Sequence, residues 1–216
     1  KSFDLSKAFC AKLYFRFPYL IVICNEVKGS HSIIMADQTT CIPWQNQKQW
    51  QALTPFFDTI RNLHYKDLNP LYQQAETIRQ LFISLSRPMD ELCAAICIHC
   101  QDICCKKATI WFDFKDLLYL YFAFGRLPDA QISKNKDHAG HCQCCHFSST
   151  GCLVSRLERP FVCTWYLCPD QKQVLMSGDD VKGEVFMATI NRIKGLRTEM
   201  ESQFCRLSAG MQDMER

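Results

Sequence analysis

Four cysteines lie within nine residues in the segment Cys97-Ile98-His99-Cys100-Gln101-Asp102-Ile103-Cys104-Cys105. Thiolates at such close spacing can converge on one small volume, where the usual occupant is a soft metal ion or an iron–sulfur cluster. A second group follows downstream and comprises Cys142, Cys144, Cys145, Cys152, Cys163 and Cys168. Together the two groups indicate a metal site. Signals for an enzyme elsewhere in the chain are weaker.

The spacing of the first group allows two local geometries. If residues 93–104 are helical, Cys93, Cys97, Cys100 and Cys104 share one face, because they follow one another at steps of four, three and four residues. If the segment is a loop, Cys97 and Cys100 form the tight chelate that is typical of zinc and iron–sulfur sites. Either geometry gathers thiolates and leaves Cys105 to serve a second metal or to bridge two.

Composition favours a reduced, metal-loaded protein over a disulfide scaffold. The chain has 216 residues, 15 of them cysteines, and 48% of its residues are hydrophobic, so a core can form without disulfide staples. The adjacent pairs Cys104-Cys105 and Cys144-Cys145 cannot close on themselves without strain, and an odd count leaves at least one thiol free. Reduced thiols predict a cytoplasmic protein. The net charge of +3, without a long Lys/Arg run, predicts no nucleic-acid partner.

The N-terminal region is predicted to be an extension. Its apolar run from Phe17 to Cys24 is too short to cross a bilayer, so we expect no membrane span. Met35-Ala36-Asp37 is typical of a natural start, and residues 1–34 would then lie upstream of it.

Periodicity predicts helices before the cysteine groups. Thr54-Pro55 is typical of a helix start, and Asn69-Pro70 predicts a second one. The second helix shows the clearest amphipathic pattern in the chain, and Arg87-Pro88 is expected to end it. Its apolar positions are Leu71, Ala75, Ile78, Phe82 and Leu85.

Weaker signals follow the first cysteine group. Residues 108–114 predict a short strand, and residues 116–124 a helix that Gly125 ends. Residues 128–151 lack periodicity and are predicted to be a loop ordered by metal ligation. A final apolar stripe recurs every three or four residues and predicts a helix packed on its own domain. It comprises Phe186, Ile190, Ile193, Leu196, Met200, Phe204 and Leu207, with Met211 and Met214 as an extension.

These elements predict an α+β, mainly helical fold in which a small metal-stabilised cysteine-cluster domain is flanked by amphipathic helices. The helical N-terminal part is expected at 35–92, the cysteine-cluster domain at 93–170 and the C-terminal amphipathic helix at 171–216.

The order of the cysteine motifs is similar to that of a known family. The motifs are Cys97 to Cys105, Cys145-His146-Phe147, Gly151-Cys152, Arg159-Pro160, Cys163 and Cys168-Pro169. Over roughly residues 93–170 they resemble the YkgJ-like cysteine-cluster proteins, a family of zinc- or iron-chelating domains marked by CxxCxxCC. The resemblance implies eight metal ligands, namely Cys97, Cys100, Cys104, Cys105, Cys145, Cys152, Cys163 and Cys168. Unlike the family pattern, three residues rather than two separate Cys100 from Cys104, and Ser148 replaces the apolar residue after Phe147.

Several occupants and functions stay open. Eight thiolates suffice for two four-cysteine zinc sites or for one 4Fe–4S cluster with spare thiols, and the spacing does not separate zinc from iron. All-thiolate ligation favours a structural or electron-transfer centre over hydrolytic zinc chemistry. Residues 100–105 also look like the cluster of flagellin lysine methylases, which leaves an iron–sulfur-dependent enzyme for redox or methyl-transfer chemistry as an alternative. A zinc-stapled interaction module that uses the C-terminal helix is another.

Further cysteines and histidines near the second group are weaker candidates. Cys142, Cys145 and His146 match the C-x-x-C-H signature of c-type haem attachment, which would leave the first group unexplained. His138, His141 and His146 are expected to be solvated rather than to replace a thiolate. Cys93, Cys142 and Cys144 are candidate auxiliary ligands, and no catalytic residue can be assigned.

Overall fold

The computed structural model describes residues 44, 46–64, 66–108, 110–132, 134–136, 142–144, 146–148, 151–177 and 180–214. The predicted extension 1–34, Cys145, His138 and His141 lie outside these residues. The described elements are α2 (Gln47–His64), α3 (Asn69–Ile96), η4 (Cys97–His99), α4 (Cys104–Lys107), α5 (Phe114–Phe124), β1 (Lys134–Lys136), β2 (Cys142–Cys144), β3 (Phe147–Ser148), β4 (Gly151–Cys152), η5 (Arg156–Glu158), α6 (Val162–Trp165), α7 (Pro169–Ser177) and α8 (Asp180–Met214).

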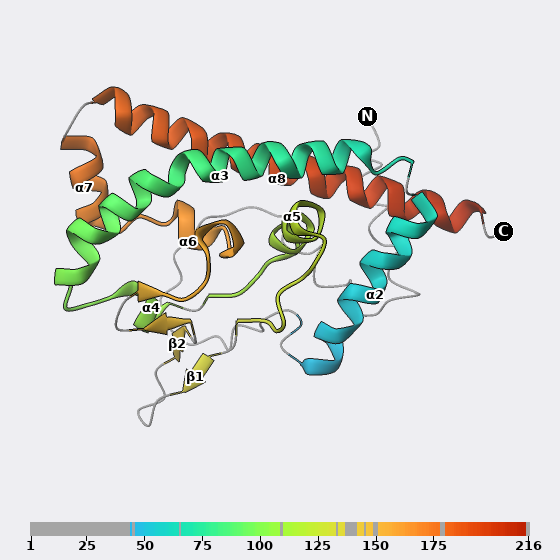
Figure 1. The fold of residues 1–216 in the computed structure, drawn as a ribbon, viewed down its shortest axis with the longest axis horizontal. Helices are drawn as coiled ribbons and strands as arrows, with labels where there is room; N and C mark the ends of the chain where they lie inside the picture. Colours follow the sequence, from blue (N-terminus) through green and yellow to red (C-terminus); the bar gives the residue numbers. More distant parts are fainter. Residues whose placement is uncertain are drawn as a thin grey trace, which may run out of the picture.

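The fold is mainly helical, as predicted. Two long helices, α3 and α8, lie side by side, and α5 packs against both (Figure 1). The described strands form two short antiparallel pairs, β1 with β2 and β3 with β4. None of the described helices is both long and apolar enough to cross a membrane.

The predicted apolar faces of α3 and α8 form the core together with α5. On α3 all five predicted apolar positions are buried, which confirms the amphipathic pattern, namely Leu71, Ala75, Ile78, Phe82 and Leu85. The α8 stripe is buried at Phe186, Ile190, Ile193, Met200 and Phe204, so it packs on its own chain as expected. Because this face lies inside the core, it is not available to a partner protein.

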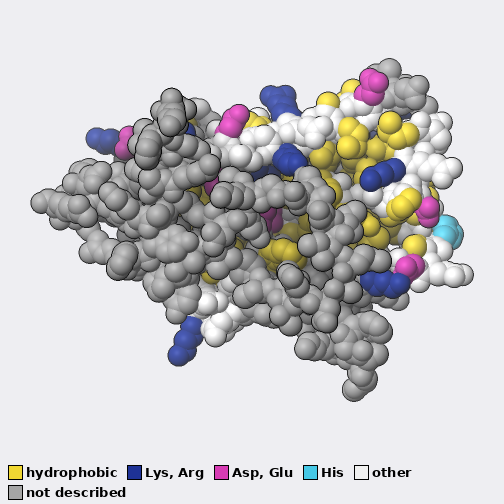
Figure 2. Space-filling model, turned by 180° about the vertical axis from the view of Figure 1, so that it is seen from behind, with side chains coloured by type: hydrophobic (Ala, Val, Ile, Leu, Met, Phe, Trp, Pro, Cys, Tyr) yellow, Lys and Arg dark blue, Asp and Glu magenta, His cyan; other side chains and the backbone are white. Residues whose placement is uncertain are grey.

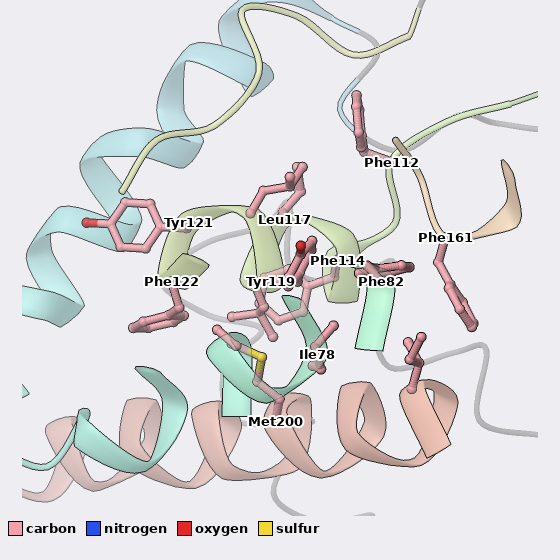
Figure 3. Packing of buried hydrophobic residues seen from close by; sticks show 14 of the residues in the cluster. Ile78, Phe82, Phe112, Phe114, Leu117, Tyr119, Tyr121, Phe122, Phe161 and Met200 are labelled. Atoms are coloured by element: carbon pink, nitrogen blue, oxygen red, sulfur yellow. The ribbon is translucent and has the colours of Figure 1, made fainter. Parts of the chain in front are cut away.

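Aromatic rings fill the space between these helices. The Phe204 ring of α8 lies 5.6 Å from that of Phe57 and 5.7 Å from that of Phe114, centroid to centroid. Phe161, just before α6, lies 6.1 Å from the Phe82 ring of α3 (Figure 3). This last contact attaches the cysteine-bearing part of the chain to the helical core.

Local capping sets the limits of α5. The Asp113 side chain accepts the Asp116 N–H and the Asp116 side chain accepts the Asp113 N–H, a reciprocal capping box. The helix therefore begins at Phe114, two residues before the predicted start. It ends as predicted at Gly125, whose φ of 70° lies in the left-handed region that glycine adopts without a Cβ clash.

Two predicted helix boundaries at prolines were wrong. Helix α2 begins at Gln47, so Pro55 lies inside it, and α3 continues past Pro88 to Ile96. A proline inside a helix costs about 3 kcal/mol. Burial of Met89 and Leu92 beyond Pro88 contributes about 1.5–3 kcal/mol for each side chain, which offsets that cost. The extended α3 crosses the predicted domain boundary at residues 92 and 93.

The predicted strand at 108–114 and the predicted loop at 128–151 were also wrong. Residues 110–113 have no strand partner. Instead, the buried Gln131 side chain accepts the Phe112 N–H at 2.7 Å and donates to the Phe112 carbonyl at 3.1 Å, as a neighbouring strand would. The 128–151 segment contains β1, β2 and β3, whose backbone pairing gives it order that periodicity cannot reveal.

Candidate metal centre

The cysteine-bearing segments gather at one end of the helical core. Helix α4 packs against β2, and α7 packs against α3 near its C-terminal end (Figure 1). Cys97 opens η4 and Cys100 follows it, Cys104 and Cys105 open α4, Cys152 ends β4, Cys163 lies in α6, and Cys168 precedes α7. Cys145, the remaining predicted ligand, is outside the described residues.

Cys93, near the end of α3, joins four of these cysteines in what we call the first thiol group. The group comprises Cys93, Cys97, Cys100, Cys104 and Cys168. The pKa of Cys97 is raised to about 12, first by burial and then by the neighbouring Cys93, Cys168 and Cys104 in that order of effect. Burial and then Cys168 raise the pKa of Cys104, with a smaller contribution from Cys100. The five thiols are therefore close enough for their charges to interact, although they come from two separate parts of the chain, residues 93–104 and Cys168.

The second thiol group consists of Cys105, Cys144, Cys152 and Cys163. The pKa of Cys105 is raised to about 11, first by burial and then by the neighbouring Cys144 and Cys152. Burial also raises the pKa of Cys163, followed by the effects of Cys105, Cys152 and Cys144, while the Arg159 guanidinium opposes the shift. Cys144, which the sequence indicated only as an auxiliary ligand, is buried among these thiols.

The boundary between the first and second thiol groups separates two residues that are adjacent in the sequence. Cys104 belongs to the first group and Cys105 to the second, because neighbouring positions on the short helix α4 point in different directions. The two groups still adjoin, since Cys104 contributes to the raised pKa of Cys105. This arrangement matches the expectation that Cys105 projects away from the other cysteines of its motif.

The thiols fit a soft metal ion in number and type, but their sulfurs are not drawn together around one point. Within the described ranges, no three Cys, His, Asp or Glu side chains form a ready metal-binding group. Burial and the neighbouring thiols raise the pKa of Cys97 to about 12 and that of Cys105 to about 11, so a nearby positive charge is needed to form these two thiolates at neutral pH. A zinc or iron ion supplies that charge, and the sulfurs would have to close around it.

Cys168 is fixed by the start of α7. Its Sγ accepts the Gln171 N–H at 3.4 Å, and its own N–H donates to Gln171 Oε1 at 3.2 Å. This is a capping box in which cysteine replaces serine or threonine, and Pro169 occupies the first helical position, where proline is favoured. Because Oε1 is engaged, the amide Nε2 of Gln171 points to sulfur, with distances of 3.6 Å to Cys97 and 3.8 Å to Cys93.

Two further side chains lie near sulfurs of the first thiol group. The Nη2 atom of Arg156 lies 3.9 Å from Cys93 Sγ and also donates to Asp90 Oδ1 at 2.5 Å. The Tyr166 hydroxyl lies near Cys104 and opposes the rise in the pKa of that thiol. Donors to sulfur stabilise thiolates and orient metal ligands.

A buried ion network holds α6 against the core. Arg197 of α8 donates to Asp113 Oδ1 at 2.7 Å and to Asp116 Oδ1 at 2.6 Å, and its guanidinium lies 4.4 Å from the centre of the Phe161 ring. Asp116 Oδ1 also accepts the Phe161 N–H at 2.9 Å. Cys163 follows two residues later, so this network positions the second thiol group relative to α5 and α8.

Apolar side chains surround the thiol groups at the surface. Ile98, Leu153, Trp165 and Tyr166 are all exposed and lie on the segments between the cysteines. Figure 2 shows hydrophobic side chains, cysteines included, gathered at the end of the molecule where Figure 1 places α7. His99 is exposed and His146 is partly exposed.

The sequence contained one signal for a missed site residue. Cys168-Pro169-Asp170-Gln171 has the spacing of a capping box, and that pattern points to Gln171. No local pattern points to Arg156, whose place beside Cys93 depends on the path of the chain after β4. Comparison of the chain with protein-family models, with curated proteins and with solved structures finds no match.

Proposed function

We propose that this protein is a metal-chelating cysteine-cluster protein that binds zinc or iron in two thiolate centres, one in each thiol group. The observation that supports it is the convergence of thiols from distant segments into two groups at one end of the core. The resemblance of the motif order to the YkgJ-like proteins supports the same function. Cys145 belongs to the proposed ligand set by that resemblance.

The donor set favours a structural or electron-transfer role. Each group offers at least four thiols, enough to fill the coordination of a tetrahedral zinc ion or to hold an iron–sulfur cluster. A fully thiolate-ligated zinc has no open position for substrate or water. When bound, the metal would link short segments that have little core of their own, or in the iron–sulfur form carry electrons.

Metal analysis after anaerobic purification tests the proposal. The expected result is stoichiometric zinc, or iron with sulfide and the visible charge-transfer absorbance of an iron–sulfur cluster. Cys97→Ser should reduce the bound metal, whereas Cys205→Ser, on α8 and outside both thiol groups, should not. A wild-type protein with neither metal, or equal metal content in the two variants, would contradict the proposal.

The same measurement separates the alternatives. Colourless protein with zinc excludes an iron–sulfur-dependent enzyme, whether for redox chemistry or for lysine methylation. Brown protein with iron and sulfide excludes a module stapled only by zinc. The pyridine haemochrome spectrum tests haem attachment at Cys142 and Cys145, and no haem absorbance is expected.

A further inference from the structure

Cys93 lies one helical turn before Cys97, on the same face of the chain. The Cys97 N–H bonds to the Cys93 carbonyl at the end of α3, so the helical path continues between the two residues. Among the neighbouring thiols, Cys93 has the largest effect on the pKa of Cys97. The eight positions implied by the family resemblance do not include Cys93.

Gln171 brings Cys93 into contact with the same donor as Cys97. Its amide orientation is fixed, because Oε1 accepts the Cys168 N–H in the capping box. The Nε2 atom then lies 3.8 Å from Cys93 Sγ and 3.6 Å from Cys97 Sγ, and the Gln171 backbone N–H donates to Cys168 Sγ. Gln171, which is 6% exposed, thus donates to three sulfurs of the first thiol group, two through its side chain and one through its backbone N–H.

Arg156 places a buried positive charge beside Cys93. Its side chain is 8% exposed, whereas that of its partner Asp90 is 67% exposed. Among the described residues, the buried Nη1 atom of Arg156 has no hydrogen-bond partner. A buried guanidinium with one largely solvated partner is costly unless further negative charge lies near it. Four thiolates around a divalent ion carry a net charge of −2, which is the kind of charge this position favours.

We propose that Cys93 is a ligand in the first metal centre, with Cys97, Cys104 and Cys168, and that Gln171 and Arg156 donate hydrogen bonds to its sulfurs. The proposal rests on the proposed function. The first thiol group has five thiols and a tetrahedral ion takes four, and hydrogen-bond donors are directed to the sulfurs of Cys93, Cys97 and Cys168. Cys100 then lies at the edge of the centre, next to Cys104.

Cobalt substitution tests this ligand set. Co²⁺ is titrated into metal-free wild type, Cys93→Ser and Cys205→Ser, and the sulfur-to-cobalt charge-transfer absorbance per bound ion reports the number of thiolate ligands. Cys93→Ser should lose about one quarter of that absorbance in the first centre, or lose that ion and keep the one in the second thiol group. Cys205→Ser should match wild type. Full occupancy with unchanged absorbance in Cys93→Ser overturns the inference, while absence of binding in wild type overturns the proposed function as well.

Gln171→Glu provides a test that does not remove a thiol. Glutamate keeps the acceptor for the Cys168 N–H, but it replaces the donor that faces Cys93 and Cys97 with a carboxylate oxygen. We expect about 10–100-fold weaker metal binding in the first centre, with the second centre unchanged. Gln173→Glu, two residues along α7 and exposed, is the matched control. Equal affinity of Gln171→Glu and Gln173→Glu would overturn the inference.

Discussion

Replacement of Arg197 by methionine is expected to be strongly destabilising. The guanidinium is 5% exposed and joins two carboxylates, Asp113 at 2.7 Å and Asp116 at 2.6 Å. Methionine preserves much of the apolar volume, so packing is disturbed little. The main change is that Asp116, itself 7% exposed, loses the cation that compensates its charge.

The size of the expected loss in stability follows from the burial of this ion pair. Removal of one partner from a buried ion pair costs about 3–5 kcal/mol, because the other charge is left uncompensated. That is a large part of the roughly 5–15 kcal/mol by which a domain is stable. Arg192→Met, on an exposed face of the same helix, should change stability by less than about 0.5 kcal/mol.

The penalty should also depend on pH. Burial raises the pKa of Asp116, and Arg197 opposes that effect, so the Arg197→Met variant has an even higher pKa at this carboxyl. A carboxyl with a raised pKa in the folded state stabilises fully below the ordinary Asp pKa, and this contribution is lost as pH rises through the folded-state value. The destabilisation should therefore be smaller at about pH 5 than at about pH 8.

Urea unfolding followed by circular dichroism at both pH values tests this reasoning. Addition of Asp116→Asn to Arg197→Met should restore part of the lost stability and reduce the pH dependence, because the buried Asp116 carboxylate is removed. A penalty below about 1 kcal/mol would refute the assignment of a buried ion pair. A penalty of equal size at both pH values would refute the role of Asp116.

Three further predictions concern metal uptake and local structure. Because the pKa of Cys97 is raised to about 12 and that of Cys105 to about 11, both thiols are protonated at neutral pH and must release protons on binding. Apparent metal affinity, measured by competition with a chromophoric chelator, should rise by up to about tenfold per pH unit for each proton released, and a flat profile would contradict this. Gln131→Leu leaves the buried Phe112 N–H without its acceptor and should cost about 1–3 kcal/mol in urea unfolding, with no loss if water replaces the amide. Gly125→Ala meets no neighbouring atom but forces alanine into the left-handed region, so thermal unfolding should show a loss of about 1–2 kcal/mol, and unchanged stability would indicate that the helix end has shifted.

Local sequence predicted the fold correctly where interactions between residues close in the chain determine the structure. The apolar spacing of Leu71 to Leu85 and the glycine at 125 gave the correct helix face and the correct helix end, since both depend on residues close in the chain. Pro88 shows the limit of this approach. Its local penalty predicted a helix end, but burial of Met89 and Leu92 depends on α8 and α7, which sequence periodicity does not place.

The candidate site was predictable as a set of thiols but not as two groups. The family resemblance predicts Cys104 and Cys105 as metal ligands, yet their separation into different groups depends on which segments approach each face of α4. The second group is completed by Cys144 and Cys152, which the β1–β2 and β3–β4 pairs present. Backbone pairing of such short strands leaves no periodic pattern in the sequence.

Removal of bound metal should affect the two ends of the molecule differently. The cysteines lie on elements of two to four residues, such as α4, α6 and β4, which are too short to be stable alone. Apart from core contacts such as Phe161, they are attached to the helices through a few buried polar contacts, among them Asp116 to the Phe161 N–H and Arg156 to Asp90. By contrast, α3, α5 and α8 share a continuous aromatic and aliphatic core.

If metal ligation orders the cysteine end, chelation of the metal should leave the helical core folded while the cysteine-bearing segments lose protection. Hydrogen exchange followed by mass spectrometry can resolve this difference. Peptides covering 97–107 and 151–168 should exchange faster after chelation, whereas those covering 71–85 and 190–204 should change little. Uniform loss of protection would mean that the metal stabilises the whole fold. No change in either set would mean that hydrogen bonds and core contacts alone hold the thiol groups in place, and the proposed metal-stabilised character of the domain would then be wrong.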